Sequence, residues 1–253
     1  MLKNKVALSL LAHPDDAEFT CAGTLALLGQ KGWDIHITTM TPGDCGSAEY
    51  DREEISNIRR KEAANGAKII DGKYSCLECD DVFIMYDRST LLKVIEVIRR
   101  VKPAIVFAPS PRDYFVDHEN TSRLVWTGCF SAGIPNIAIA GVEPFEPIPY
   151  LYYVDATGCV DIFGNQIKPT TLIDITDTIE TKEKMLCCHE SQRNWLRLHH
   201  GIDEYVISMK RFAKDKGSLI QKNYAEGFRQ HLGHAFPKDN ILKTELGQQV
   251  HLF

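Results

Sequence analysis

The feature that most constrains the fold is a short apolar strand followed at once by a helical pattern. Residues 6–11 form a β-like apolar run bounded by turn residues. The apolar residues after it recur at helical spacing: Ala17, Cys21, Leu25 and Leu28. This order predicts an open α/β sheet, in which functional residues concentrate at the carboxyl ends of strands. The turn between the two elements reads Ala-His-Pro-Asp-Asp at residues 12–16, which places a histidine and two carboxylates at such an end.

Strands and helices alternate along the first half of the chain, and this predicts a Rossmann-like, doubly wound sheet that is mainly parallel. The expected strands are 6–11, 34–40, 68–71, 81–85 and 104–108, and the expected helices are 15–31, 52–65, 91–101 and 118–132. In the common strand order 3-2-1-4-5, the strands at 6–11 and 104–108 are neighbours where the order reverses. Residues far apart in the sequence would then meet in one crevice.

The first turn carries two candidate metal ligands. His13 and Asp16 lie three residues apart, so an imidazole nitrogen and a carboxylate oxygen would reach one Zn²⁺ at about 2.0–2.2 Å. Asp15 is expected to point elsewhere, because successive residues at a helix start are rotated by about a quarter turn or more. One aspartate would then hold a metal while its neighbour handles protons. The alternative is that Asp15 or Asp16 only caps the helix, since aspartate is a preferred N-cap residue.

A second polar cluster follows the apolar run at 104–108. It covers residues 112–120 and reads Arg-Asp-Tyr-Phe-Val-Asp-His-Glu-Asn. His118 in this cluster is a third ligand candidate at a strand-to-helix junction. Two histidines and one aspartate, with further coordination positions open, are a donor set typical of catalytic zinc.

These two stretches resemble the LmbE-like or PIG-L-like family of zinc-dependent N-deacetylases. Two further elements are similar to the family: Arg59-x-x-Glu62 on the helix after the second strand, and the glycine-rich stretch from Gly43 to Gly46. The resemblance covers roughly residues 5–190. It implies a hydrolase that removes an acyl group, most simply acetyl, from the nitrogen of an amino sugar or its conjugate. It also implies a homo-oligomer.

The resemblance assigns roles by motif position. It implies one Zn²⁺ per chain, held by His13, Asp16 and His118, with Asp15 as the general base. Asp117, directly before His118, would orient that ligand by a hydrogen bond.

The residues expected to touch the substrate are Asp44, Arg59, Tyr114 and Phe115. Many family members have His-x-Asp-His at the second motif, whereas this chain has Phe115 in place of the first histidine. Because a phenyl ring donates no proton and polarises no oxygen, another group must supply that donor. Tyr114 is the nearest candidate in the sequence. The others lie in the C-terminal part: His189, His231 and His234.

Length and charge limit the class of protein. The 253 residues are enough for one α/β domain, which we expect to have its core at 1–132 and to be completed by residues 133–253. No apolar stretch reaches the ~18 residues that span a bilayer, and no signal-peptide pattern is present, so a cytoplasmic protein without membrane contact is expected. The net charge of −5, without a basic stripe, argues against nucleic acid as a partner. The eight cysteines are interpreted as reduced.

After residue 132 the pattern loosens. A loop rich in glycine and proline precedes an expected strand at 150–154, a hairpin-like segment follows at 160–175, and helices are expected from Thr178 and Asp203. Residues 224–229 are interpreted as part of a C-terminal helix packed on the sheet. Long loops in compact domains are usually functional or disordered, and this one is expected to bind substrate or contact another subunit.

Two other classes of protein remain open. A catalytically silent metal- or sugar-binding protein would keep the ligands and lose the acid, and Phe115 favours this alternative. A metal-dependent phosphoesterase would also use aspartate and histidine. Two-metal sites need further bridging carboxylates, however, and the sequence has no third acidic motif at a strand end.

Overall fold

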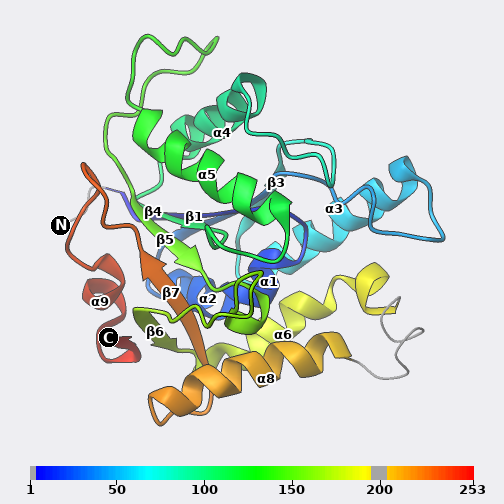
Figure 1. The fold of residues 1–253 in the computed structure, drawn as a ribbon, viewed down its shortest axis with the longest axis vertical. Coiled ribbons are helices and arrows are strands. Elements are labelled where there is room, and N and C mark those ends of the chain that lie inside the picture. The colour runs from blue at the N-terminus through cyan, green and yellow to red at the C-terminus, as the bar shows by residue number, and fades with distance from the viewer. Residues whose placement is uncertain (1–3, 195–203) are drawn as a thin grey trace.

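The central feature of the computed structural model, which describes residues 4–194 and 204–253, is one mixed sheet between two layers of helices (Figure 1). Its strand order is β3-β2-β1-β4-β5-β7-β6-β8. The strands are β1 (Val6–Leu11), β2 (Asp34–Thr39), β3 (Lys73–Cys76), β4 (Ile105–Ala108), β5 (Tyr150–Val154), β6 (Thr171–Asp174), β7 (Ala225–Gln230) and β8 (Val250–Leu252).

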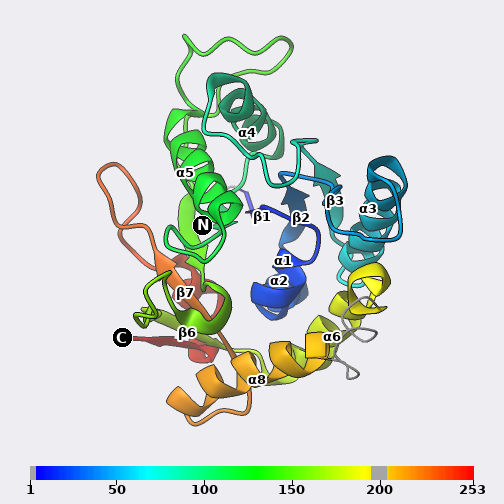
Figure 2. The same cartoon turned by 45° about the vertical axis from the view of Figure 1, so that its right-hand side comes forward.

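Helices cover both faces of the sheet (Figures 1 and 2). One face packs on the apolar sides of α4 and α5, and the other packs on α2, α6, α8 and α9. The helices are α1 (Asp16–Thr20), α2 (Ala22–Gln30), α3 (Arg52–Lys68), α4 (Arg88–Val101), α5 (Val116–Ser131), α6 (Ile179–Cys187), α8 (Glu204–Leu219) and α9 (Ile241–Leu246). None of the helices described here is both long and apolar enough to cross a bilayer.

The five strands β3, β2, β1, β4 and β5 are parallel and follow the predicted order 3-2-1-4-5. The order reverses between β1 and β4, which pair directly, so the loops after these two strands diverge to opposite faces and leave a crevice. All six residues of β1 are buried, as the continuous apolar run predicts for a central parallel strand. The doubly wound, mainly parallel fold is confirmed.

Two predicted strands are wrong. Lys68 is the last residue of α3, and residues 69–71 form the turn that follows it. The helix extends this far because Ala63 and Ala67 on its inner side are buried. Asp71 then adopts a left-handed conformation with φ 53°, and the third strand starts only at Lys73. Residues 81–85 form a loop, whose apolar side chains Val82, Phe83 and Met85 are exposed.

Three further expectations differ from the structure. The helix expected at 15–31 is interrupted at Cys21, which separates α1 from α2. The expected hairpin-like segment at 160–175 is present only in its first part, where Val160 and Gln166 form an antiparallel bridge, whereas β6 pairs with β7 and β8. Residues 224–229, expected to be helical, form most of β7, because β5 and β6 lie on either side and supply its hydrogen-bond partners. Asp203, the expected start of a helix, lies outside the described residues.

A buried ion pair joins β7 to the first helices. The Glu226 carboxylate accepts hydrogen bonds from the backbone amides of Gly23 (2.9 Å) and Thr24 (2.7 Å) in the first turn of α2. Lys182 from α6 donates to the same carboxylate at 2.5 Å, and both charged side chains are 2% exposed. An anion at a helix N-terminus satisfies amides that have no partner within the helix. This contact ties the C-terminal strands to the segment that follows the first motif.

We therefore predict that Glu226→Gln destabilises the protein by about 3–5 kcal/mol, because Lys182 would keep a buried charge without its partner. Urea unfolding followed by circular dichroism measures this change. The control is Lys73→Ala, which removes an exposed ion pair with Asp34 and should cost less than ~1 kcal/mol. Equal midpoints for Glu226→Gln and the parent would contradict the role assigned to this pair.

Candidate metal centre and its cavity

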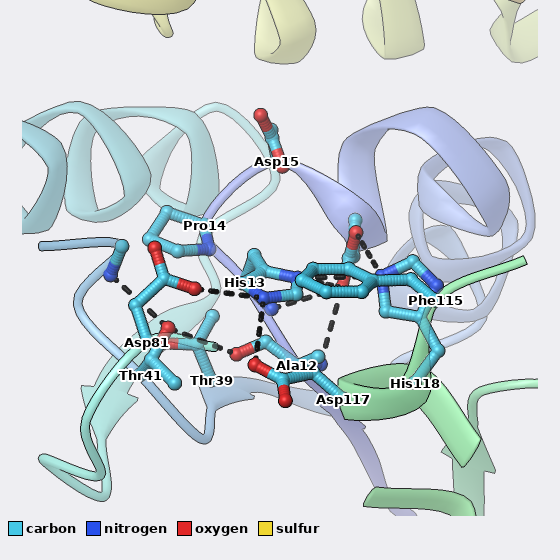
Figure 3. A network of polar contacts seen from close by, with 12 residues as sticks. Ala12, His13, Pro14, Asp15, Thr39, Thr41, Asp81, Phe115, Asp117 and His118 are labelled. Atoms are coloured by element: carbon cyan, nitrogen blue, oxygen red, sulfur yellow. Dashed lines mark hydrogen bonds and ion pairs between the residues drawn. The ribbon is translucent and has the colours of Figure 1, made fainter. Parts of the chain in front are cut away.

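The segments after β1 and β4 bring together His13, Asp16 and His118, the last in the first turn of α5. Figure 3 shows the two histidines side by side. His13 Nδ1 lies 3.3 Å from His118 Nε2 and 3.5 Å from Asp16 Oδ2. His118 Nε2 lies 3.5 Å from Asp16 Oδ1. Tetrahedral ligands at 2.0–2.2 Å from zinc are separated by about 3.3–3.6 Å, so these three groups have the spacing of a zinc donor set.

The outer nitrogens of both imidazoles face carboxylates. His118 Nδ1 lies 2.9 Å from Asp113 Oδ1, and His13 Nε2 lies 3.1 Å from Asp81 Oδ1 and 3.5 Å from Asp117 Oδ2. A proton on each outer nitrogen leaves a lone pair on each inner nitrogen, and the two lone pairs then face each other and Asp16. That arrangement is repulsive without a cation between the groups, so the donor set fits a metal ion.

The electrostatics of the cluster also favour a cation. Burial lowers the pKa of His118, but the carboxylates of Asp16 and Asp113 outweigh it and raise the pKa to about 10. Burial likewise opposes the rise at His13, whose pKa lies well above its usual range because of the carboxylates around it. Burial raises the pKa of Asp16, yet His118 and His13 hold it well below its usual range. The cluster therefore attracts positive charge, supplied by protons or by a metal ion.

Backbone hydrogen bonds fix the position of Asp16. Its Oδ2 accepts from the amides of Ala12 (3.1 Å) and His13 (2.9 Å), which turns the carboxylate back toward the end of β1. Neither aspartate acts as a simple helix cap. Asp15 occupies the N-cap position without a side-chain capping bond, and Asp16 instead accepts from amides at the end of β1. The capping alternative is therefore not supported.

Asp15 points away from the cluster, as expected (Figure 3). Its Oδ2 accepts hydrogen bonds from the Tyr205 hydroxyl (2.5 Å) and from Arg59 Nη2 (3.3 Å). Its backbone has φ 101°, a left-handed conformation that costs a residue other than glycine about 1–3 kcal/mol. Arg59 also binds the carbonyls of Pro14 and Gly43, so this buried arginine helps to hold the turn in its strained form.

Two residue assignments need correction. The partner of His118 is Asp113, not Asp117, because Asp117 is adjacent to His118 on α5 and points instead toward His13 and the Val82 amide. Asp44 is not positioned to touch a substrate. Its carboxylate is bound by Arg52 and by the Asp81 amide, and it joins two loops behind His13.

The aromatic residues of the second motif enclose the histidines. The Phe115 ring stacks on His13 with ring centroids 5.3 Å apart and an interplanar angle of 7°. Tyr114 packs edge-on against His118 and is 64% exposed. Among the histidines considered as donors, His189 is fully buried near Glu18, and His231 is hydrogen-bonded to Tyr153. Tyr114 is thus the proposed donor that borders the cavity.

A cavity of about 460 Å³ opens beside the cluster. Asp15, Asp16 and His118 lie on its wall, and α8 closes the opposite side with Tyr205 and Phe212. This volume lies within the range of small-molecule sites. The cavity connects the candidate metal centre to a space large enough for a small substrate.

Sequence reasoning gave no role to four residues near the site. Asp81 and Asp113 hold the two histidines, Tyr205 binds Asp15, and Asp155 lies on the cavity wall. Asp113 sits within the second polar cluster, so a search for a carboxylate before His118 would have found it. The other three belong to loops or to α8, where no periodicity or motif indicates proximity.

Comparisons with known proteins show what the chain is similar to. Residues 8–129 match the family model described as PIG-L, GlcNAc-PI de-N-acetylase. Diacetylchitobiose deacetylase from Thermococcus kodakarensis is 29% identical over 236 residues, which are 89% of this chain and 82% of that protein. The structure of N,N'-diacetylchitobiose deacetylase from Pyrococcus horikoshii has a TM-score of 0.79 and 25% identity, covering 94% of this chain and 89% of the other.

A relative of different activity is also similar. The 4-oxalmesaconate hydratase of Pseudomonas putida is 26% identical over 205 residues, which are 75% of each chain. The chain therefore resembles the PIG-L, or LmbE-like, family over residues 8–129, and the proteins similar to it include both deacetylases and this hydratase.

We predict that His13→Ala and His118→Ala each abolish stoichiometric metal binding, because two ligands remain in place of three. Metal analysis of the purified, zinc-loaded proteins measures the effect. Full occupancy in both variants would refute the site. A cluster that only stabilises the fold would give unstable variants and a parent protein without metal.

A second prediction concerns Asp113. Its replacement by Asn should weaken zinc affinity by about 10–100-fold, because the hydrogen bond that sets the tautomer and direction of His118 would weaken. Competition with a zinc-binding dye measures this affinity. Asp80→Asn alters an exposed carboxylate and should leave it unchanged. If both variants bind zinc like the parent, Asp113 has no orienting role.

Proposed function

We propose that this protein is a zinc-dependent hydrolase that removes an acyl group, most simply acetyl, from the nitrogen of an amino sugar or its conjugate. The observation that carries the proposal is the placement of three converging donors, His13, Asp16 and His118, beside a cavity that Asp15 also lines. The deacetylases among its relatives support this reaction class. The proposed substrate class, an N-acylated amino sugar, follows from the names of these deacetylases and from the family resemblance.

Zinc would be held by the two histidines and Asp16, and would supply a Lewis acid that activates water and polarises the substrate carbonyl. Asp15 takes the proton of the attacking water. Its Oδ2 already accepts two hydrogen bonds, so Oδ1 is the atom that receives this proton. Burial raises the pKa of Asp15 and the Arg59 charge opposes this rise, which keeps the carboxylate available as a base.

The leaving amine must gain a proton. Asp15 can return the one that it has taken, and the Tyr114 hydroxyl is positioned at the cavity to donate a hydrogen bond to the substrate. Phe115 instead shields His13 from solvent by stacking on it. We also propose a cytoplasmic location, from the sequence pattern, and a homo-oligomeric state, from the family resemblance.

Hydration of a carbon–carbon double bond is the second candidate function. The similarity to 4-oxalmesaconate hydratase favours it. Phe115 weakens the case for amide hydrolysis, because the histidine that many family members have at this position is absent. Both reactions would use an activated water and a base at the same site. They differ in the substrate: an N-acyl amine or an unsaturated carboxylic acid.

An acetate-release screen over N-acetylated sugars and glycoconjugates, with apo and zinc-loaded protein, separates these possibilities. We expect acetate release only from the loaded protein. A parallel measurement of ultraviolet absorbance with unsaturated polycarboxylates detects hydration. Activity only in the second assay would replace the proposal with the hydratase, whereas no turnover in either would favour a silent binding protein.

We predict that Asp15→Asn retains zinc and loses acetate release by at least about 10²–10⁴-fold, because the amide cannot accept the proton. Turnover and metal content are measured on the same sample. Parallel loss of metal and activity would mean that Asp15 is a ligand. Turnover close to that of the parent would exclude it as the base.

A further inference from the structure

Asp155 is a buried carboxylate on the wall of the cavity that the proposed mechanism does not use. It follows β5 directly, at the same edge of the sheet as the loop after β4, and borders the cavity shared with Asp15, Asp16 and His118. Only 7% of the residue is exposed. Its position on the wall requires an explanation, because a buried carboxylate is costly unless it is paired and hydrogen-bonded.

The hydrogen bonding of Asp155 is incomplete. Its Oδ1 is buried and has no hydrogen-bond partner. Its Oδ2 accepts only a weak contact from the Cys159 thiol at 3.9 Å, and Lys216 Nζ lies 3.6 Å away, beyond ordinary hydrogen-bond length. Lys216 therefore compensates part of the charge and leaves the acceptor Oδ1 unused. A buried acceptor of this kind is available for a hydrogen bond from a water molecule or a ligand.

The neighbouring strand is shaped around this carboxylate. Gly227 on β7 lies beside Asp155, and a Cβ at Gly227 would overlap Asp155 Oδ2. The absence of a side chain at Gly227 thus lets the carboxylate occupy its position at the edge of the sheet. The backbone of β7 at Gly227 therefore leaves the space that the Asp155 carboxylate occupies.

The charge of the cavity wall restricts what can bind. Among the described lining residues, the carboxylates are Asp15, Asp16, Asp113, Asp155 and Glu204. No lysine or arginine belongs to this described lining. The cations nearest Asp155 are Lys216 and Arg229, which lie outside this lining and act on the Asp155 charge itself. A substrate carboxylate or phosphate beside Asp155, away from the proposed zinc, would meet like charge, whereas a hydroxyl or an ammonium group would find an acceptor.

We propose that Asp155 Oδ1 accepts a hydrogen bond from a hydroxyl or amine of the substrate, and that it selects neutral or cationic saccharides over phosphorylated or carboxylated ones. This inference rests on the proposed function and deepens it by naming the substrate class. It also opposes the polycarboxylate substrates that a hydratase would need. Asp155 binds the substrate away from the reacting bond, so its effect should fall on affinity.

The test compares the parent with Asp155→Ala and Asp155→Asn, all zinc-loaded. The probes are N,N'-diacetylchitobiose, its fully deacetylated form and N-acetylglucosamine 6-phosphate. Acetate release gives kcat and KM, and calorimetry gives Kd for the deacetylated disaccharide. We expect Asp155→Ala to raise KM and Kd by about 10–100-fold while kcat changes less than threefold, as for a lost hydrogen bond to a charged group.

Asp155→Asn keeps one acceptor oxygen and removes the charge. It should weaken disaccharide binding less than Asp155→Ala does. We also expect kcat/KM for the phosphorylated probe, divided by kcat/KM for the neutral disaccharide, to rise by at least about tenfold. This variant tests the proposal even if Asp155→Ala folds poorly. The matched control is Asp161→Ala, which removes another buried carboxylate of the same loop that does not line the cavity. Its Kd should equal that of the parent.

The outcomes separate this inference from the proposed function. Disaccharide binding that is lost in Asp155→Ala supports the inference even if the parent releases no acetate, in which case hydrolysis fails alone. Acetate release with the same KM in the parent and in both Asp155 variants overturns the inference and leaves the hydrolase intact. A parent that prefers the phosphorylated probe, or that binds no saccharide, also overturns it. A lower kcat at unchanged KM would assign Asp155 only a structural role.

Discussion

The carboxylate of Asp16 is the interaction on which the site depends. Two backbone amides at the end of β1 hold one of its oxygens, and the carboxylate faces the inner nitrogens of His13 and His118. Because β1 and β4 are neighbours at the point where the strand order reverses, the second histidine arrives beside the first. The ligand geometry is thus a consequence of strand order and of one hydrogen-bonded turn.

Outer carboxylates complete this arrangement and orient the two imidazole rings. Asp113 and Asp81 face the outer nitrogens of the two histidines, so each ring presents its lone pair to the interior. Arg59 holds the strained turn at Asp15 through bonds to the carboxylate and to two carbonyls. The strain at Asp15 separates the direction of its side chain from that of Asp16, and this separation is what the proposed division into a metal ligand and a base requires.

The C-terminal half contributes to both stability and recognition. Glu226 on β7 binds the first amides of α2 and pairs with Lys182 on α6, which fastens the added strands to the segment after the first motif. The same half supplies Tyr205 and Asp155 to the cavity wall. A substrate would therefore contact the motif-bearing core on one side and the less regular second half on the other, where relatives with different reactions are free to differ.

The sequence by itself predicted the parallel core and the three candidate donors, because continuous apolar runs and motifs at strand ends are local signals. The strand order was predicted only as the order common to doubly wound sheets. The sequence identified His13, Asp16 and His118 before any contact between them was known. The sequence pattern predicted the third strand at the wrong residues. It also predicted a helix where β7 forms, since strand formation at residues 225–230 depends on β5 and β6 as partners. Only the tertiary structure decided that Asp113 orients His118, that Tyr205 binds Asp15 and that Asp155 faces the cavity. These contacts join segments whose proximity is set by packing, and packing of this kind leaves no periodic trace in the chain.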